Sequence, residues 1–222
     1  MIKLLNITKK YGNNVILNDV SLEIKDGEFI GIIGESGSGK TTLLQVMSGI
    51  IPNDGGDIFY DDINICKLKE EELFEWRKNN VGFVFQINNL VDELTVQDNL
   101  EIAMLIKGED RAAFKSKIFE ALKEVNLVGF ETKKVSNLSG GEKQRVAIAM
   151  AIVRKPKILF ADEPTGSLDS KNGQKIMELF KEINKKYKTT IIMVTHSLNQ
   201  LKYCSRSISI KDGLILQNEK GK

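Results

Sequence analysis

The feature that most constrains the fold is a glycine-rich octapeptide that directly follows an apolar run. Residues 34–41 read GESGSGKT, and residues 28–33 before them are apolar on both faces of an extended chain. An apolar strand followed by G-x-x-x-x-G-K-T is the pattern of a phosphate-binding loop. The glycines Gly34, Gly37 and Gly39 let successive backbone N–H groups point inward at phosphate oxygens. The octapeptide therefore predicts a cradle for nucleotide phosphates on an α/β core.

The polar side chains of this loop suggest how the cradle is completed. Lys40 provides a positive charge for the β- and γ-phosphates, and the Thr41 hydroxyl suits Mg²⁺, which prefers oxygen ligands. Ser36, Ser38 and Thr42 are expected to face the same nucleotide. We therefore expect ATP and Mg²⁺ as ligands of this loop.

The composition excludes several classes of partner. The chain has 222 residues, with 32 basic and 30 acidic side chains, so its net charge of +2 does not favour nucleic acid or an anionic membrane surface. Cys66 and Cys204 lie far apart, which favours neither a disulfide framework nor a zinc site and fits a reduced cytosolic setting. Apolar stretches approaching the roughly 20 residues of a membrane span are missing, and the start is too short and polar for a secretion signal. Any membrane role is expected to come through a partner.

Other apolar runs predict two sheets. Val20, Leu22 and Ile24 alternate with polar residues, which is typical of a half-buried strand in an antiparallel sheet. Residues 81–85, 158–161 and 191–194 are short, continuously apolar and rich in β-branched or aromatic side chains, as expected in a parallel sheet buried on both faces. Residues 207–216 predict a hairpin whose turn is Asp212-Gly213.

Between these runs, residues 87–136 are expected to form an inserted helical arm. Thr95-x-x-Asp98 is a capping pattern for one helix, and Gly108 can end it. Asp110 can cap a second helix, whose apolar face is expected to pack in the core rather than bind a cofactor. That face consists of Phe114, Ile118, Leu122 and Val125.

Each buried run ends at a polar residue with useful chemistry. Gln86 follows the run at 81–85, Asp162 and Glu163 follow the run at 158–161, and His196 follows the run at 191–194. In an open parallel sheet the carboxyl ends of the strands share one edge, where ligands bind. We therefore expect these four side chains to meet at the phosphate loop.

Each of these residues has a catalytic interpretation and a structural one. Asp162 is the expected carboxylate for Mg²⁺, directly or through water, and Gln86 can hold a metal-bound water or simply cap a turn. Glu163 can accept a proton from the water that attacks the γ-phosphate, or orient that water; otherwise it is an exposed loop acid or an ion-pair partner. His196, the only histidine, can donate a hydrogen bond to the γ-phosphate or be structural.

Ser139, Gly140 and Gly141 indicate a second anion site. Residues 138–145 read LSGGEKQR and lead into an alanine-rich apolar run, so they begin a helix. Ser139 and Glu142 form a capping box, which explains these two residues without a ligand. The paired glycines are not explained by capping, and they expose N–H groups at the positive end of a helix.

This combination of motifs resembles the ATPase subunits of ATP-binding-cassette (ABC) transporters, over almost the whole chain. The resemblance rests on the phosphate loop, Gln86, LSGGEKQR at 138–145, ILFADEP at 158–164, residues 167–169 and His196. It implies a P-loop NTPase core with a mostly parallel sheet, an N-terminal antiparallel β subdomain and an inserted α-helical subdomain. Residues 1–222 would form a single ABC ATPase domain, in which 1–86 and 137–222 are the core and 87–136 the helical subdomain.

The resemblance also implies partners and further ligand contacts. Two such subunits pair head to tail around two Mg-ATP, so that Ser139, Gly140 and Gly141 of one close on the phosphate held by the other. The second subunit would be another copy of this chain or a homologous ATPase, and both would act through integral membrane permease subunits at the cytoplasmic face of the membrane. Tyr11 matches the aromatic that stacks on adenine, with strand packing as its alternative role. Asp169 matches an aspartate that communicates between the paired sites.

Residues 81–100 and 161–170 look most like the ATPases of lipoprotein-release, macrolide-export and antimicrobial-peptide-resistance systems, which perform export or extraction. Three other interpretations remain open from the sequence. A related subgroup transmits force during cell division without moving a solute, and its motifs would look the same. A P-loop kinase would phosphorylate an acceptor instead of activating water, and a nucleotide-gated scaffold would bind ATP without useful turnover; LSGGE, Glu163 and His196 argue against these two.

Overall fold

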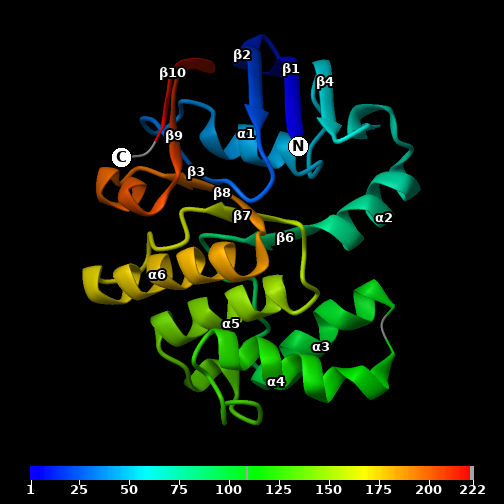
Figure 1. Ribbon diagram of the computed structural model, residues 1–222, viewed down its shortest axis with the longest axis vertical. Coiled ribbons are helices and arrows are strands. Elements are labelled where there is room, and N and C mark those ends of the chain that lie inside the picture. Colours follow the sequence, from blue (N-terminus) through cyan, green and yellow to red (C-terminus); the bar gives the residue numbers. More distant parts are fainter. Residues whose placement is uncertain (109, 221–222) are drawn as a thin grey trace.

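The apolar runs of the sequence assemble into one sheet at the centre of the molecule (Figure 1). The computed structural model describes residues 1–108 and 110–220. Within this part of the chain the central sheet consists of β3 (Phe29–Ile33), β6 (Val81–Val84), β7 (Ile158–Asp162), β8 (Thr190–Thr195), β9 (Arg206–Lys211) and β10 (Leu214–Lys220). The strand order is β10-β9-β3-β8-β7-β6; neighbours from β9 to β6 are parallel, and β10 is antiparallel. The predicted mostly parallel sheet is therefore confirmed.

Both faces of the sheet are buried at its inner strands β3, β7 and β8, because nearly all of their residues are apolar. Leu159 and Ile191 belong to a cluster on the face covered by α5 (Gly140–Ile152) and α6 (Ser170–Tyr187). Phe160 and Ile192 belong to a second cluster on the opposite face, against α1 (Lys40–Met47). Two covered faces hold the strands rigidly, and this fixes the sheet edge at which the strands end.

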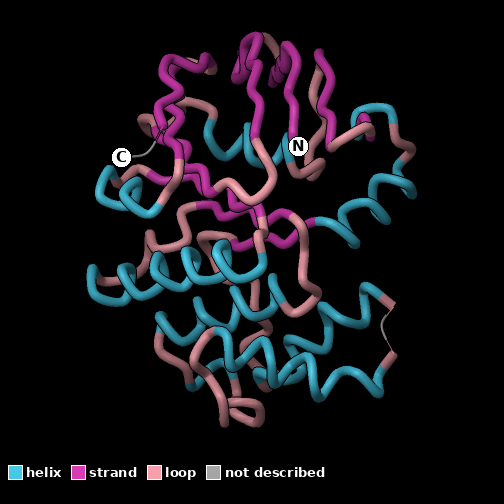
Figure 2. Tube along the Cα trace, in the orientation of Figure 1, coloured by secondary structure: helices cyan, strands magenta, loops and turns pink. Residues whose placement is uncertain are grey.

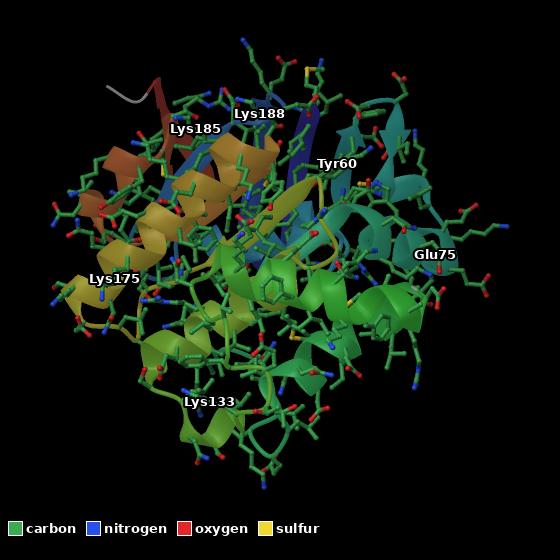
Figure 3. The ribbon with its side chains drawn as sticks, turned by 60° about the horizontal axis from the view of Figure 1, so that its bottom comes forward. Tyr60, Glu75, Lys133, Lys175, Lys185 and Lys188 are labelled. Atoms are coloured by element: carbon green, nitrogen blue, oxygen red, sulfur yellow. The ribbon has the colours of Figure 1, made fainter. Side chains whose placement is uncertain are left out.

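An antiparallel sheet covers the α1 side of the molecule. Its strands are β1 (Ile2–Tyr11), β2 (Asn14–Ile24), β4 (Gly55–Tyr60) and β5 (Ile63–Asn64), in the order β2-β1-β4-β5. Val20, Leu22 and Ile24 of β2 are buried, as their alternation predicts. Tyr60, labelled in Figure 3, packs its ring 4.5 Å from that of Trp76 and donates its hydroxyl hydrogen to the Met47 carbonyl at the end of α1. The antiparallel sheet thus supports the helix that follows the phosphate loop.

The helical arm lies beyond α5, on the other side of the central sheet (Figures 1 and 2). It contains α3 (Val96–Lys107), η2 (Arg111–Ala113), α4 (Phe114–Glu124) and η3 (Val135–Asn137). Thr95 and Asp98 form the predicted capping box, and Gly108 ends α3 in the left-handed conformation with φ 73°. Asp110 caps η2, which leads into α4 with Phe114 and Ile118 buried. Residue 109 lies outside the described part of the arm.

The remaining elements are short or peripheral. They are η1 (Ile65–Lys67), α2 (Glu70–Asn80) and η4 (Leu198–Tyr203). Asp212 and Gly213, with φ of 48° and 74°, form the predicted turn between β9 and β10. Within residues 1–108 and 110–220, none of the helices has the length and apolar character needed to cross a lipid bilayer.

Candidate active site

The phosphate loop connects β3 to α1, and packing within the chain requires its first and last glycines. A Cβ atom on Gly34 would lie 2.2 Å from the carbonyl oxygen of Ile210. A Cβ atom on Gly39 would lie 2.8 Å from the carbonyl oxygen of Ile16, and Gly39 has φ 99°, which side chains disfavour. Gly37 also has a positive φ, 79°, but open space surrounds its Cβ direction. The chain therefore holds the loop tightly at both ends and leaves its middle open.

The end of α1 inside this loop offers uncapped donors to an anion. Gly39 is the N-cap, no side chain caps it, and the first turn has no acidic residue. The buried hydroxyl oxygen of Ser38 has no hydrogen-bond partner among the described residues. Lys40 is buried, and its Nζ donates to the carbonyl oxygens of Gly34 at 2.9 Å and Glu35 at 2.7 Å. Free N–H groups, an unpartnered hydroxyl and a buried ammonium are the donor set that phosphate oxygens need.

A cavity of about 510 Å³ opens above this loop and gathers residues from distant parts of the chain. Tyr11 and Ile16 from the antiparallel sheet line one part of it, and Glu163 and His196 from the ends of β7 and β8 line another. The loop and α1 supply the rest of the lining, namely Ser36, Gly37, Gly39, Lys40, Thr41 and Thr42. Glu163 and His196, at the ends of β7 and β8, therefore lie at the phosphate loop as the sequence predicts, whereas Gln86 is not among the residues that line this cavity.

Thr41 and Asp162 form the part of the site that suits a cation. The Thr41 hydroxyl donates to Oδ1 of Asp162 at 3.1 Å. The pKa of the Asp162 carboxyl is raised, chiefly by burial and further by the neighbouring Glu163 carboxylate. The hydrogen bond from Thr41 and the Lys40 ammonium act in the opposite direction and lower this pKa. Among the described residues, groups of three or more His, Cys, Asp and Glu that could hold a metal do not occur. A hydroxyl and one carboxylate beside a phosphate cradle fit Mg²⁺, which is commonly bound by one or two carboxylates together with substrate phosphates.

Glu163 and His196 contact each other across the ends of neighbouring strands. The Nδ1 atom of His196 lies 3.3 Å from Oε2 of Glu163, and the exposed fractions of the two side chains are 66% and 23%. The Glu163 N–H donates to the carbonyl oxygen of Val194, and Glu163 has a φ of 43°, a conformation that costs a non-glycine residue free energy. This conformation keeps the carboxylate at the cavity, so the strain coincides with the position of the candidate base.

Gln86 lies beside the loop that carries Glu163. It follows β6 and Phe85, and it is exposed. A Cβ atom built on Gly166 would lie 3.3 Å from Nε2 of Gln86 and 3.5 Å from Oε2 of Glu163. Both side chains therefore reach the same point next to Gly166.

The environment of Tyr11 includes two charged residues that the sequence patterns do not single out. The Tyr11 ring is 53% exposed, and Nζ of the buried Lys9 lies 5.5 Å from its centroid. Asp54 binds Nζ of Lys9 at 3.3 Å and accepts a hydrogen bond from the Lys10 N–H at 2.6 Å. The Lys10 N–H, followed by the Lys9 ammonium, lowers the pKa of Asp54. An exposed ring at the cavity, with a cation 5.5 Å from its centroid, is available for stacking on a base.

Ser139, Gly140, Gly141 and Asp169 lie outside the 510 Å³ cavity, as far as the described residues define its lining. Ser139 is the N-cap of α5, and its hydroxyl donates to Oε2 of Glu142 at 2.7 Å. These hydrogen bonds from the Ser139 hydroxyl and N–H lower the pKa of Glu142. Asp169 caps α6, and its carboxylate accepts hydrogen bonds from the N–H groups of Lys171 and Asn172. Within one chain Ser139 and Asp169 therefore have structural partners, and none of the four residues lines the cavity above the phosphate loop.

The fold and the site together define the class of this protein. A phosphate loop stands at the carboxyl edge of a parallel sheet, with a buried lysine, a hydroxyl and carboxylate pair and a second carboxylate around one cavity. That arrangement is typical of the P-loop nucleotide-binding proteins.

Comparison with known proteins identifies the family. The family model described as "ABC transporter" matches residues 17–166. The "Uncharacterized ABC transporter ATP-binding protein MJ0796" of Methanocaldococcus jannaschii is 42% identical, over 99% of this chain and 97% of that protein. The structure titled "Dimeric structure of a post-hydrolysis state of the ATP-binding cassette MJ0796 bound to ADP and Pi" has a TM-score of 0.90 and covers 100% of this chain and 99% of that one.

Two further relatives carry more specific names. The "Bacitracin export ATP-binding protein BceA" of Halalkalibacterium halodurans is 41% identical over 95% of this chain and 85% of its own length. The "Lipoprotein-releasing system ATP-binding protein LolD" of Bacteroides thetaiotaomicron is 39% identical over 97% of this chain and 99% of its own length. The chain therefore belongs to the ABC transporter family, as an ATP-binding subunit, and the resemblance to its ATPases is confirmed.

Proposed function

We propose that this chain hydrolyses ATP in the cavity above the phosphate loop, as half of a head-to-tail pair that drives separate membrane subunits. One observation carries the proposal. Lys40, Glu163 and His196 line a single cavity, whereas the second glycine-rich helix end at Ser139 lies outside it. A cavity with a base but without its second anion site needs that site from another molecule. The MJ0796 cassette has been solved as a dimer, and in a dimeric post-hydrolysis state bound to ADP and Pi, which supports this arrangement.

The reaction divides among the residues of the cavity. The loop N–H groups, the Ser38 hydroxyl and the Lys40 ammonium bind the β- and γ-phosphates. Oε2 of Glu163 takes the proton of the water that attacks the γ-phosphorus, and the bond between that phosphorus and the β,γ-bridging oxygen breaks, giving ADP and inorganic phosphate. His196, 3.3 Å from Glu163, holds the γ-phosphate by a hydrogen bond. Tyr11 stacks on adenine, and the Lys9 ammonium, paired with Asp54, contacts its ring.

Thr41 and Asp162 are proposed to hold Mg²⁺, and Gln86 to hold a water bound to it. When bound, Mg²⁺ neutralises charge on the β- and γ-phosphates. The structural support is the hydroxyl and carboxylate pair at 3.1 Å beside Lys40, since oxygen donors and a phosphate cradle are what this cation requires.

The second copy, or a homologous ATPase, is proposed to supply Ser139, Gly140 and Gly141 to the γ-phosphate. Gly140 and Gly141 open α5, and the chain itself leaves space at both: Cβ atoms there would meet side-chain atoms at no less than 3.4 Å. Asp169 lies on the neighbouring helix end and is proposed to communicate between the two sites.

Residues 87–136 are proposed to form the helical subdomain, which contacts the permease subunits together with the strand end at Gln86. An apolar groove of about 200 Å³ lies there between β6, α3 and α5. Ile106, with 51% of its surface exposed, lines this groove, and Ile87, with 81% exposed, directly precedes the lining residue Asn88 in the chain. Exposed apolar side chains around a groove mark a protein interaction site. In this assembly the chain would lie at the cytoplasmic face of the membrane, held by the permease, and power export or extraction as the names of BceA and LolD suggest.

Glu163→Gln tests the proposal. The amide keeps the size of the side chain but cannot take a proton, so we expect ATP turnover to fall by a factor on the order of 10² to 10⁴ while nucleotide still binds. An ATP-bound dimer should accumulate in gel filtration with Mg²⁺ and ATP. Glu71→Gln, at an exposed residue of α2, is the matched control and should turn over like the wild type. Phosphate release by Glu163→Gln at the wild-type rate would contradict the assigned role.

A further inference from the structure

A second polar cavity, of about 560 Å³, adjoins the nucleotide site and shares two residues with it. Glu163 and His196 line both cavities. The rest of the second cavity is formed by residues of the loops after β7 and β8, the first turns of α6 and η4. Its walls are therefore the segments that hold the two candidate catalytic side chains in position.

The Gln200 side chain lies in the wall of this cavity and connects the loops after β7 and β8 through hydrogen bonds. Its Oε1 accepts a hydrogen bond from the Thr195 hydroxyl at 2.8 Å. Its Nε2 donates to the Thr165 hydroxyl oxygen at 2.5 Å. Thr195 directly precedes His196 in the chain, and Thr165 is two residues after Glu163. One amide group thus connects the residue before His196 with the residue two positions after Glu163.

Both threonines are firmly held, so the bridge has fixed ends. Thr195 is 2% exposed and Thr165 is 8% exposed. The Thr195 hydroxyl oxygen also accepts a hydrogen bond from the Ser197 N–H at 3.0 Å, which fixes the backbone on the far side of His196. The Leu168 N–H donates to the Thr165 carbonyl oxygen at 3.1 Å. A change in the distance between these ends would change the distance between the two loops.

Packing alone does not hold the catalytic pair. The His196 side chain is 66% exposed, so few neighbours restrain it apart from the Glu163 carboxylate. The Glu163 backbone is in the left-handed region with φ 43°, which persists only where surrounding contacts enforce it. The Gln200 bridge ties the loop of the strained residue to the loop of the exposed one.

We propose that Gln200 is a positioning residue for ATP hydrolysis, which sets the distance between Glu163 and His196 through Thr165 and Thr195. This inference rests on the proposed function, because it concerns the same reaction. Gln200 lines the second cavity and is not among the residues that line the nucleotide cavity, so it acts on turnover and not on nucleotide affinity. A side chain that acts on the alignment of a base and a phosphate-binding group should lower kcat and leave KM for ATP unchanged.

The experiment replaces the amide by an apolar side chain of similar size. Gln200→Met keeps the packing volume and removes both hydrogen bonds, and we expect kcat to fall about tenfold because small misplacements of reacting groups have large effects on rate. KM for ATP and the affinity for labelled ATP should stay at wild-type values, whereas the melting temperature should fall by a few degrees, because the buried hydroxyls of Thr165 and Thr195 lose a hydrogen-bond partner; rates are therefore measured well below it and per folded protein. Gln174→Met is the matched control: Gln174 lines the same cavity but binds Glu178 of its own helix, so its loss should leave kcat unchanged.

Variants at the other end of the bridge separate positioning from general destabilisation. Thr165→Val should reproduce the loss of kcat, Thr165→Ser should restore most of it, and the Thr165→Val, Gln200→Met double variant should be no slower than either single variant. Additive losses in the double variant, or a loss of kcat that disappears when the rate is expressed per folded protein, would overturn the proposal. So would wild-type kcat in Gln200→Met. A wild-type protein that releases no phosphate from Mg-ATP would refute the proposed function instead, which keeps the two failures distinct.

Discussion

The two glycine-rich helix ends of this chain differ in what requires their glycines. At the phosphate loop the chain's own atoms exclude a side chain, since a Cβ on Gly34 would lie 2.2 Å from a backbone oxygen. At the start of α5 a Cβ on Gly140 would approach Leu168 no closer than 3.7 Å, and one on Gly141 would approach Asn172 no closer than 3.4 Å. These are ordinary contacts. Packing within one molecule therefore explains the glycines of the phosphate loop. It does not explain the glycines of α5, which we attribute to a group from another molecule.

The N-terminal caps of α1 and α5 differ too, and this difference agrees with the one between their glycines. The end of α1 has a glycine cap without a capping side chain, and its first turn carries no carboxylate. The end of α5 is closed by Ser139 and Glu142, which hydrogen-bond each other. An uncapped end is ready for an anion, while a capped end must exchange its internal hydrogen bonds for contacts to a ligand. The phosphate loop can thus bind an anion in the monomer, whereas the end of α5 becomes an anion site only when two molecules assemble.

Among substitutions at the two helix ends, Lys40→Ala should have the largest effect, and this effect should be visible in isolated monomers. The substitution removes a buried ammonium that donates to two loop carbonyls and that we propose as the ligand of the phosphates. We expect the affinity for ATP to fall by about a hundredfold, as for a lost charge-assisted contact in a buried site. Titration with labelled ATP at low protein concentration measures it, with the exposed Lys25→Ala as control. Unchanged affinity would show that the loop does not bind the phosphates.

Gly141→Ala, in contrast to Lys40→Ala, should lower turnover without changing the binding of ATP by the monomer. The new Cβ fits within the chain, and alanine favours a helix over glycine by about 1 kcal/mol, so the melting temperature should stay equal or rise. Affinity of the monomer for ATP should not change. Turnover should fall about tenfold or more, because the methyl group covers the N–H groups offered to the second molecule's phosphate. Weaker binding of ATP by the monomer would contradict the division between the two ends.

Mixing Lys40→Ala with Gly141→Ala tests whether the phosphate loop of one chain works with the glycine pair of the other chain. A pair made of one Lys40→Ala chain and one Gly141→Ala chain contains one site with an intact phosphate loop and an intact second glycine pair. The mixture should therefore release phosphate faster than either variant alone at equal total concentration. Absence of any gain would mean that each chain completes its own site.

Much of the fold follows from the sequence because the decisive signals are local. Apolar runs at 81–85, 158–161 and 191–194 become parallel strands, and the residues that follow them meet at one edge since parallel strands end together. The caps at Thr95 and Asp110 and the end at Gly108 depend on neighbours within a few residues. Helix α2 is not predicted, because its pattern is mostly charged and only Trp76 of it is buried.

The parts of the site that the sequence does not predict depend on contacts between distant segments. Gln200 meets Thr165 across 35 residues, and only the packing of η4 on the loop after β7 brings them together. Lys9 lies among polar residues of β1 and would be expected in solvent, yet Asp54 from 45 residues away pairs with it in a nearly buried position. Neither pair has a motif, so only the three-dimensional structure reveals them.

The smallest effect is expected for Glu142→Gln, which makes the end of α5 more like that of α1. Glutamine can keep the hydrogen bond to Ser139 but loses the charge at the positive end of the helix, so the free energy of unfolding should fall by about 0.5 kcal/mol at neutral pH. Hydrogen bonds from Ser139 lower the pKa of Glu142 in the folded state. The contribution of the Glu142 charge to the free energy of unfolding is therefore complete above the ordinary glutamate pKa of 4.5 and is lost as the pH falls through the lowered value. Urea unfolding should therefore show the difference between wild type and variant at pH 7 and show it closing as the solution becomes more acidic than the lowered pKa. A difference that stays constant across that range would mean that the charge of Glu142 does not stabilise this helix end, and the contrast between the two ends would then rest on their glycines alone.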